Sequence, residues 1–240
     1  MKVEIWSDYI CPFCYIGKRR FEAALARFEH KEGVEVVYKS FELDPNAPRD
    51  FGCDVHDMIA KKYGMSREQA VANHANLTGQ AAQVGLEYRF DEAILTNTFD
   101  AHRLSHFSAS RGKAAEMTER LLRAYFTEGK HIGDHETLAD LAAEVGLDRG
   151  EALRALQDGG YAGDVRADEE EAARLGARGV PFFVIDRKYG VSGAQPPEVF
   201  LEALNKAWEE SAPLTVVGGD ADVCGDDGCA VPGQGGSNDD

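Results

Sequence analysis

Two cysteines separated by two residues, placed where a strand gives way to a helix, constrain this chain of 240 residues more than any other feature. Residues 2–7 alternate apolar and polar side chains, which predicts a short strand. The motif Cys11-Pro12-Phe13-Cys14 follows, and apolar residues then recur at helical spacing from Ile16 to Phe28. Pro12 suits the first helical position, where its missing N–H costs nothing. The sequence therefore predicts Cys11 at the mouth of a helix.

The other segments predict an α/β chain with a long helical interruption. A second strand is expected at 34–43, a pair of strands at 180–185 and 189–191, and a last helix at 197–210. A β-α-β opening and a β-β-α close, separated by an insertion, are typical of a thioredoxin-type layout. The candidate helices of the insertion are residues 54–63, 66–84, 98–111, 113–126, 137–144, 149–157 and 164–175.

This order of elements predicts three parts of the chain. Residues 1–52 together with 160–211 are expected to form a domain with the thioredoxin fold, and residues 53–159 a large inserted all-helical domain. Residues 212–240 are rich in Gly and Asp, which is typical of a flexible C-terminal tail. That tail carries a second cysteine pair, Cys224 and Cys229.

The composition excludes several classes of partner. Against 42 acidic residues stand 26 Lys and Arg, so the net charge is -16, and such a surface repels a phosphate backbone. The longest apolar run, residues 180–185, is far shorter than the roughly 20 residues that a membrane span needs. The first residues lack a secretory signal, and five cysteines are an odd number for a secreted disulfide framework. We therefore expect a cytoplasmic protein without nucleic-acid or membrane partners.

The first cysteine pair carries the strongest chemical signal. A thiolate attacks a disulfide and forms a mixed disulfide, which a second nearby thiol must resolve. The positive end of a helix stabilises a thiolate at Cys11, and Cys14, one turn further in, is expected to be the less exposed, resolving thiol. The alternative is half of a zinc site, but that reading needs another close Cys or His pair nearby. The next close cysteine pair lies at the far end of the chain.

The segment Ile5-Trp6-Ser7-Asp8-Tyr9-Ile10-Cys11-Pro12-Phe13-Cys14 resembles the DsbA-like branch of the thioredoxin superfamily, and within it the FrnE-like group. Residues 97–104, Asn-Thr-Phe-Asp-Ala-His-Arg-Leu, and residues 179–183, Gly-Val-Pro-Phe-Phe, resemble two further blocks of that group. The resemblance implies a thioredoxin fold with a helical insertion and thiol–disulfide oxidoreductase activity. It also implies a cis Pro181 packed against the cysteine pair, which would leave the Val180 backbone free to bind an extended substrate.

One residue departs from the strongly oxidising members of this branch. Those members carry a histidine beside the second cysteine, whereas this chain has Phe13 there. Without that cation the Cys11 thiolate loses one stabilising charge, so we expect a less depressed pKa and a less oxidising couple. In a cytosol poised at about -220 to -320 mV, reduction or reshuffling is then as plausible as net oxidation. The sequence leaves the direction open.

The tail pair is the unusual feature of the chain. Gly225-Asp226-Asp227-Gly228 favours a turn that would bring the thiols of Cys224 and Cys229 together. The Gly- and Asp-rich linker before it has a reach of roughly 18 Å. Such a linker would present the tail pair to Cys11 at an effective concentration on the order of mM. A second redox pair that exchanges electrons with the first is the sharper hypothesis. The alternatives are incidental cysteines, or metal binding with Asp222 or Asp226.

Four further features have a plainer interpretation beside a functional one. Cys53 stands alone, which is typical of a small, inert filler. His102 and His106 lie one turn apart, but the residues between them lack the glutamate of a zinc-protease helix. His102 is expected either to face the cleft between the domains or to satisfy a buried carbonyl. The acidic run at residues 168–171 is interpreted as a solvated helix face.

Taken together, these signals predict a thiol–disulfide oxidoreductase, extended to isomerase activity, that acts on protein disulfides. Cys11 attacks, Cys14 resolves, and Pro181 with Val180 shapes the substrate groove. Pro12, Phe13 and His102 are the remaining candidate substrate contacts, while Phe182 and Phe183 offer an apolar patch in which Phe183 is equally suited to the core. No cofactor and no metal are expected, because the cysteines carry the electrons.

Glutathione or a thioredoxin-type reductant is the expected electron partner. Two alternatives stay open at this point. One is a glutathione-dependent transferase or isomerase of the same superfamily, although those enzymes usually lack the second cysteine of the pair. The other is a non-catalytic adaptor that binds thiols or metal.

Overall fold

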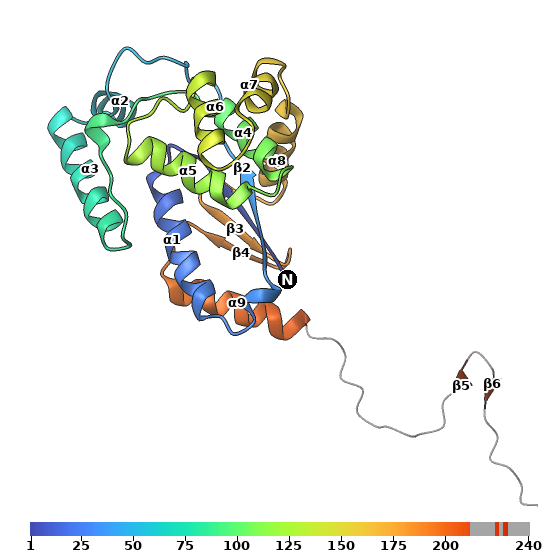
Figure 1. Ribbon diagram of the computed structural model, residues 1–240. Helices are drawn as coiled ribbons and strands as arrows, with labels where there is room; N and C mark the ends of the chain where they lie inside the picture. The colour runs from blue at the N-terminus through green and yellow to red at the C-terminus, as the bar shows by residue number, and fades with distance from the viewer. Residues whose placement is uncertain (212–223, 226–227, 230–240) are drawn as a thin grey trace, which may run out of the picture. The chain divides into compact units, whose positions relative to one another are not determined.

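The computed structural model describes residues 1–211, 224–225 and 228–229 (Figure 1). Its main sheet has the strand order β2-β1-β3-β4. Strands β1 (Lys2–Ser7) and β2 (Glu35–Ser40) are parallel, whereas β3 (Phe182–Ile185) runs antiparallel to β1, and β4 (Tyr189–Ser192) antiparallel to β3. The β-α-β opening and β-β-α close that the sequence predicts are therefore confirmed, and they share one sheet.

Two helices cover one face of this sheet, and one covers the other. Helices α1 (Pro12–Arg27) and α9 (Pro197–Ser211) supply Phe21 and Phe200, which pack with Ile5 and Phe183 into a closed apolar core. On the opposite face Trp6 of β1 packs with residues of β3 and of α8 (Ala162–Arg174). Alternating side chains of β1 thus point into both layers, as expected of a strand buried on two sides.

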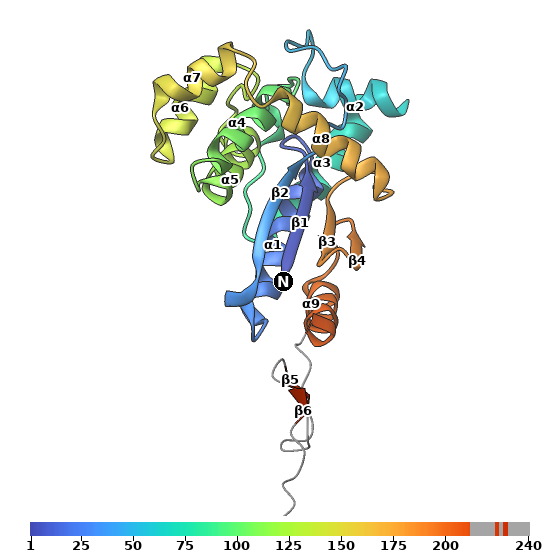
Figure 2. The ribbon, with the colours of Figure 1, turned by 90° about the vertical axis from the view of Figure 1, so that its right-hand side faces the viewer.

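The helices from α2 to α8 form a block beyond the carboxyl ends of β1 and β2, and α8 also covers the second face of the sheet (Figure 2). The core of this block includes Leu104, Met117, Leu121 and Leu138. Tyr9, just before the cysteine motif, is buried in the same core, so the motif lies where the sheet meets the block. The block comprises α2 (Val55–Tyr63), α3 (Arg67–Ala82), α4 (Phe99–Ala109), α5 (Ala114–Phe126), α6 (His135–Glu144), α7 (Arg149–Gln157) and α8; short 3-10 turns lie at Lys31–Gly33 and Phe90–Glu92.

Side-chain caps mark the starts of α2, α3, α6 and α7. Ser66 and Gln69 form the reciprocal capping box that their spacing predicts. Helix α6 begins two residues before the predicted start at 137, because the Asp134 side chain accepts from the Thr137 N–H. Strand β2 ends at Ser40, earlier than predicted, since the Leu43 N–H donates to Asp8 instead of to a neighbouring strand. No helix within the described ranges is both long and apolar enough to cross a membrane.

The chain separates into two compact units, residues 1–210 and 211–240. The finer division of the first unit, into 1–52 plus 160–211 and 53–159, stays a prediction. In the second unit β5 (Cys224–Gly225) and β6 (Gly228–Cys229) form a short antiparallel pair in which Cys224 is opposite Cys229. The rest of the predicted tail, including Asp222 and Asp226, lies outside the described residues.

Candidate functional site: a cysteine pair at the start of a helix

The first cysteine pair lies at the N-terminus of α1. Cys11 is the residue that caps the helix, with an extended backbone at φ -86° and ψ 113°, and Pro12 occupies the first turn. Cys11 and Cys14 are free thiols with exposed fractions of 5% and 2%. The prediction that Cys11 stands at a helix mouth, with Cys14 buried behind it, is confirmed.

A cis peptide bond faces the first cysteine. The Val180–Pro181 bond is cis, as the resemblance implied, and the Cys11 thiol donates to the Val180 carbonyl oxygen at 3.6 Å. Gly17 allows α1 to approach this loop closely. A Cβ at Gly17 would lie 2.9 Å from Pro181 Cγ and 3.4 Å from the Ala194 Cβ. Glycine is therefore required at this helical position for packing.

Burial keeps the second cysteine in its thiol form. Loss of solvent raises the pKa of Cys14 well above its usual value, and the neighbouring Cys11 raises it further. The main-chain N–H of Asp8 acts in the opposite direction, because it donates to Cys14 Sγ at 3.4 Å and stabilises negative charge there. Cys14 thus needs this N–H most when it loses its proton.

A large groove opens beside Cys11. Its volume is about 920 Å³, and it is bounded by the cysteine motif, by the loop that follows β2 and by α2 and α3. Its walls are mainly apolar, and Lys61 and Lys62 lie at its rim. The groove is of the size that holds a large ligand or a segment of polypeptide. Apolar side chains of the walls include Ile10, Phe13, Leu43, Met58, Ile59 and Leu77.

The predicted substrate contacts fall into two groups. Pro12, Phe13 and Val180 line the groove, and Phe13 is 43% exposed. His102 does not line it, because its side chain is 1% exposed and its Nε2 lies 3.3 Å from Asp8 Oδ1. His102 lines instead a small cavity of about 20 Å³ between β2, α4 and α5, so its location between the sheet and the helices agrees with the expectation of a cleft, while its partner is a buried carboxylate instead of a carbonyl. Contact of the first group with substrate stays a prediction.

The structure also locates Cys53, Phe183 and the acidic run at residues 168–171. Cys53 is exposed and lines the groove, so it is no buried filler. Phe183 is fully buried in the core. The acidic run is not wholly solvated, because Asp168 is 4% exposed and accepts from the Ser40 N–H at 2.9 Å, from Lys39 and from His106. Burial of Asp168 follows from its position over the outer edge of β2, whose N–H groups need acceptors.

His106 and His102 serve different carboxylates. His106 Nε2 lies 3.0 Å from Asp168 and 3.1 Å from the Ser40 hydroxyl. Within the part of the chain that the structure describes, no group of three or more His, Cys, Asp or Glu side chains is arranged to hold a metal ion.

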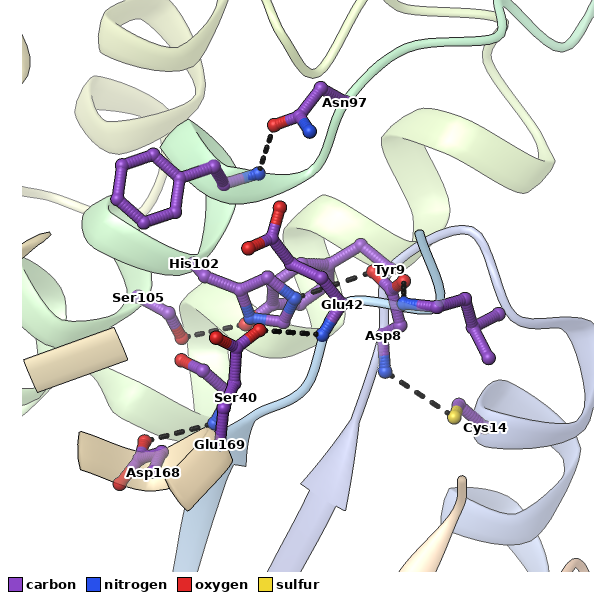
Figure 3. A network of polar contacts seen from close by, with 12 residues as sticks. Asp8, Tyr9, Cys14, Ser40, Glu42, Asn97, His102, Ser105, Asp168 and Glu169 are labelled. Atoms are coloured by element: carbon purple, nitrogen blue, oxygen red, sulfur yellow. Dashed lines mark hydrogen bonds and ion pairs between the residues drawn. The ribbon is translucent and has the colours of Figure 1, made fainter. Parts of the chain in front are cut away.

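A buried polar layer lies directly behind the cysteines (Figure 3). Asp8, which is fully buried, contributes its amide to Cys14 and its carboxylate to His102 and Leu43. Glu42 lies beside it, and its Oε1 has no hydrogen-bond partner among the described atoms. Sequence reasoning missed Asp8, Gly17 and Glu42. A short acidic residue between a strand and a helix is ordinary in a loop, so no local signal marks Asp8 as buried.

Residues 2–205 match the family described as DSBA-like thioredoxin domain. This chain belongs to that family. The probable DsbA oxidoreductase SCO1869 from Streptomyces coelicolor is similar at 53% identity and a TM-score of 0.84, over 97% of this chain and 100% of that one. The uncharacterized protein YwbO of Bacillus subtilis (strain 168) is 31% identical over 206 residues, which are 85% of this chain and 95% of YwbO.

A more distant neighbour shares the fold alone. The cytosolic disulfide reductase DsbM from Pseudomonas aeruginosa, solved with GSH, is 21% identical with a TM-score of 0.58, over 87% of this chain and 100% of DsbM. The DsbA-like family and the thioredoxin fold with a helical insertion are confirmed, and they support a function of the thiol–disulfide oxidoreductase or related isomerase type. The FrnE-like group is compatible with these matches and stays a prediction.

Proposed function

We propose that this protein is a thiol–disulfide oxidoreductase that acts on protein disulfides, with Cys11 as the attacking and Cys14 as the resolving thiol. The observation that carries the proposal is the arrangement of two free thiols at one helix start, with Cys11 lining a groove and Cys14 buried behind it. The groove gives a substrate access to one sulfur only. That asymmetry supports the two proposed roles.

The reductive half-reaction balances without any cofactor. The Cys11 thiolate attacks one sulfur of a substrate disulfide, the substrate S–S bond breaks, and one substrate thiolate leaves. Cys14 then attacks the Cys11 sulfur, the mixed disulfide breaks, and the second substrate thiol leaves. Cys11 and Cys14 end as a disulfide that has given up two electrons. The oxidative direction is the reverse, and isomerisation needs only the first step and its return.

The groove favours a polypeptide as the substrate. Its volume of about 920 Å³ and its apolar walls suit a chain segment with apolar side chains. A small polar thiol would leave most of this groove unfilled. The Val180 main chain beside Cys11 offers such a segment a hydrogen-bonding partner. Glutathione or a thioredoxin-type protein supplies or removes the electrons. The cytoplasm is the proposed compartment, since the five cysteines form no secreted framework.

One observation supports a second candidate function. DsbM, a disulfide reductase that shares the fold, was solved with GSH, so glutathione is a ligand that a site of this fold can hold, and a glutathione-dependent transferase or isomerase is the alternative. Such an enzyme has no use for a resolving thiol, and the buried Cys14 next to Cys11 therefore favours disulfide exchange. An adaptor that only binds thiols or metal would show no turnover at all.

The decisive experiment compares two single-cysteine variants in insulin reduction and in glutathione conjugation. Cys11→Ser is expected to abolish insulin reduction, whereas Cys14→Ser is expected to stop turnover while trapping a mixed disulfide between Cys11 and insulin. Cys53→Ser serves as the control, since Cys53 lines the groove without belonging to the pair. Conjugation activity that survives in Cys14→Ser, with no trapped species, would instead favour the glutathione-dependent alternative.

The tail pair extends the proposal. Directly opposed residues of an antiparallel pair have Cα atoms about 4.5–5.5 Å apart, which is within the range that a disulfide bridges. The register of Cys224 opposite Cys229 therefore supports a second redox pair, which would exchange electrons with Cys11 and Cys14. The test is the double variant Cys224→Ser/Cys229→Ser with excess reductant. Unchanged turnover and an unchanged redox state of the first pair would reject the exchange.

A further inference from the structure

A line of contacts joins the helical block to the resolving sulfur. His102 Nε2, on α4, lies 3.3 Å from Asp8 Oδ1, and the Asp8 main-chain N–H donates to Cys14 Sγ at 3.4 Å (Figure 3). An ionised carboxylate only accepts, so His102 is the donor in the first contact. Asp8 and His102 have exposed fractions of 0% and 1%. His102 thus reaches the chemistry through one intervening residue.

The Asp8 side chain is held at both of its oxygens. The Leu43 N–H donates to Oδ2 at 2.8 Å, from the segment that follows β2, while His102 holds Oδ1 from α4. A carboxylate fixed from two separate elements cannot rotate, and the attached main chain is fixed with it. The N–H of Asp8 consequently stays directed at Cys14. The Cys11 thiol makes a different contact, with the Val180 carbonyl.

The charges that surround this pair come from every neighbouring element. Glu42, after β2, lies within electrostatic range of His102, and burial raises the pKa of its carboxyl. Arg166 of α8 pairs with Glu42. Two acids therefore face one imidazole and one guanidinium. Tyr9, Cys11, Tyr88 and Tyr125 also interact electrostatically with Asp8 or Cys14, and Asp168 interacts with Tyr9.

We propose that His102 is a positioning residue for the resolving step: through Asp8 it holds the N–H that stabilises the Cys14 thiolate. In that step the Cys14 thiolate attacks the Cys11 sulfur, the bond from Cys11 to the substrate sulfur breaks, and the substrate leaves as a thiol after taking up the proton that Cys14 lost. The inference rests on the proposed function. It assigns to His102 a part in resolution and none in the first attack.

Ellman's reagent separates the two steps in one experiment. In a chain with Cys53, Cys224 and Cys229 replaced by Ser, attack of Cys11 releases one thionitrobenzoate, and attack of Cys14 on the resulting mixed disulfide releases the second. Stopped-flow absorbance follows both phases as a function of pH. The folded state of each variant is checked by circular dichroism and by its urea unfolding midpoint.

His102→Leu is expected to slow the second phase about fivefold, the effect of losing one net hydrogen bond, and to move its pH profile upward. The first phase should stay within twofold of the parent protein. His102→Gln should restore the second phase, because its side-chain amide can donate in place of Nε2. The matched control is His135→Leu, which removes another histidine paired with a carboxylate, Asp100, in the same block.

Three outcomes would overturn the inference: an unchanged second phase in folded His102→Leu, an equal slowing of both phases, or a failure of His102→Gln to restore the rate. If His102→Leu does not fold, Asp8→Asn replaces it, since one of the two anchors is lost, and the same separation of phases is expected. A parent protein that never releases the second equivalent would instead refute the resolving role of Cys14, and with it the proposed function.

Discussion

Gly17 offers the sharpest test of how α1 is positioned, because its contacts oppose its helix propensity. The residue lies within α1, one turn after Cys14, where alanine would ordinarily stabilise a helix by about 1 kcal/mol. A Cβ there would come within 2.9 Å of Pro181 Cγ, on a rigid ring next to the cis bond, and within 3.5 Å of the Ala194 Cα. Gly17→Ala must therefore push α1 away from the loop that contacts Cys11.

The size of the effect follows from two opposing contributions. Overpacking of a well-packed core costs about 1–3 kcal/mol. The helix-propensity gain of about 1 kcal/mol offsets part of this, so Gly17→Ala should lose roughly 0–2 kcal/mol of unfolding free energy. Gly79 is the matched control, since it is also inside a helix, α3, and a Cβ there would meet nothing within 4 Å. Gly79→Ala should keep the whole propensity gain.

Urea or thermal unfolding of both variants measures the difference. Gly79→Ala should be more stable than Gly17→Ala by about 1–3 kcal/mol, equivalent to roughly 2–4 °C in Tm for each kcal/mol in a chain of this size. Insulin reduction should fall in Gly17→Ala, because the contact between Cys11 and Val180 is lost, and stay unchanged in Gly79→Ala. Equal stabilisation of the two proteins would refute the close approach of α1 to Pro181.

Three other outcomes are expected. Ile59→Asp, in the groove wall, should slow insulin reduction at least tenfold without affecting Ellman's reagent, whereas Val71→Asp, exposed on α3, should change neither. Burial and the neighbouring imidazole of His56 lower the pKa of His74 to about 4. The unfolding free energy should therefore be highest above about pH 6.5 and decline towards pH 4. Urea unfolding at each pH should show a smaller decline in His74→Gln. Arg103→Met should cost about 2–4 kcal/mol in urea unfolding, because the guanidinium donates to three main-chain carbonyls at the end of α7; a loss under 1 kcal/mol would contradict this.

The helical block forms part of the candidate site as well as supporting it. It supplies the groove walls from α2 and α3 and the histidine that holds Asp8 from α4. The block that contains His102 also contains Arg103, which fixes the carbonyls at the end of α7. His102 and Arg103 of α4 thus have different partners: His102 contacts Asp8 beside the cysteines, and Arg103 contacts the end of α7.

Local sequence patterns determined the elements and the position of Cys11 at a helix start. Alternation in residues 2–7, Pro12 after Cys11, and Ser66 with Gln69 each act within one turn or one strand, so they are readable without knowledge of the fold. Most predicted helices lie within two residues of their observed bounds for this reason. The order of strands and helices then sufficed to predict the thioredoxin-type sheet.

Tertiary structure alone decided which polar residues are buried and what they bind. Asp8, His102 and Leu43 meet although they are far apart in the chain, and Asp168 is buried only because α8 crosses the edge of β2. Gly17 has an ordinary helical environment until Pro181 packs against it. The free energy of such contacts depends on partners that no local pattern specifies, since burial is a property of the packed molecule and not of the segment.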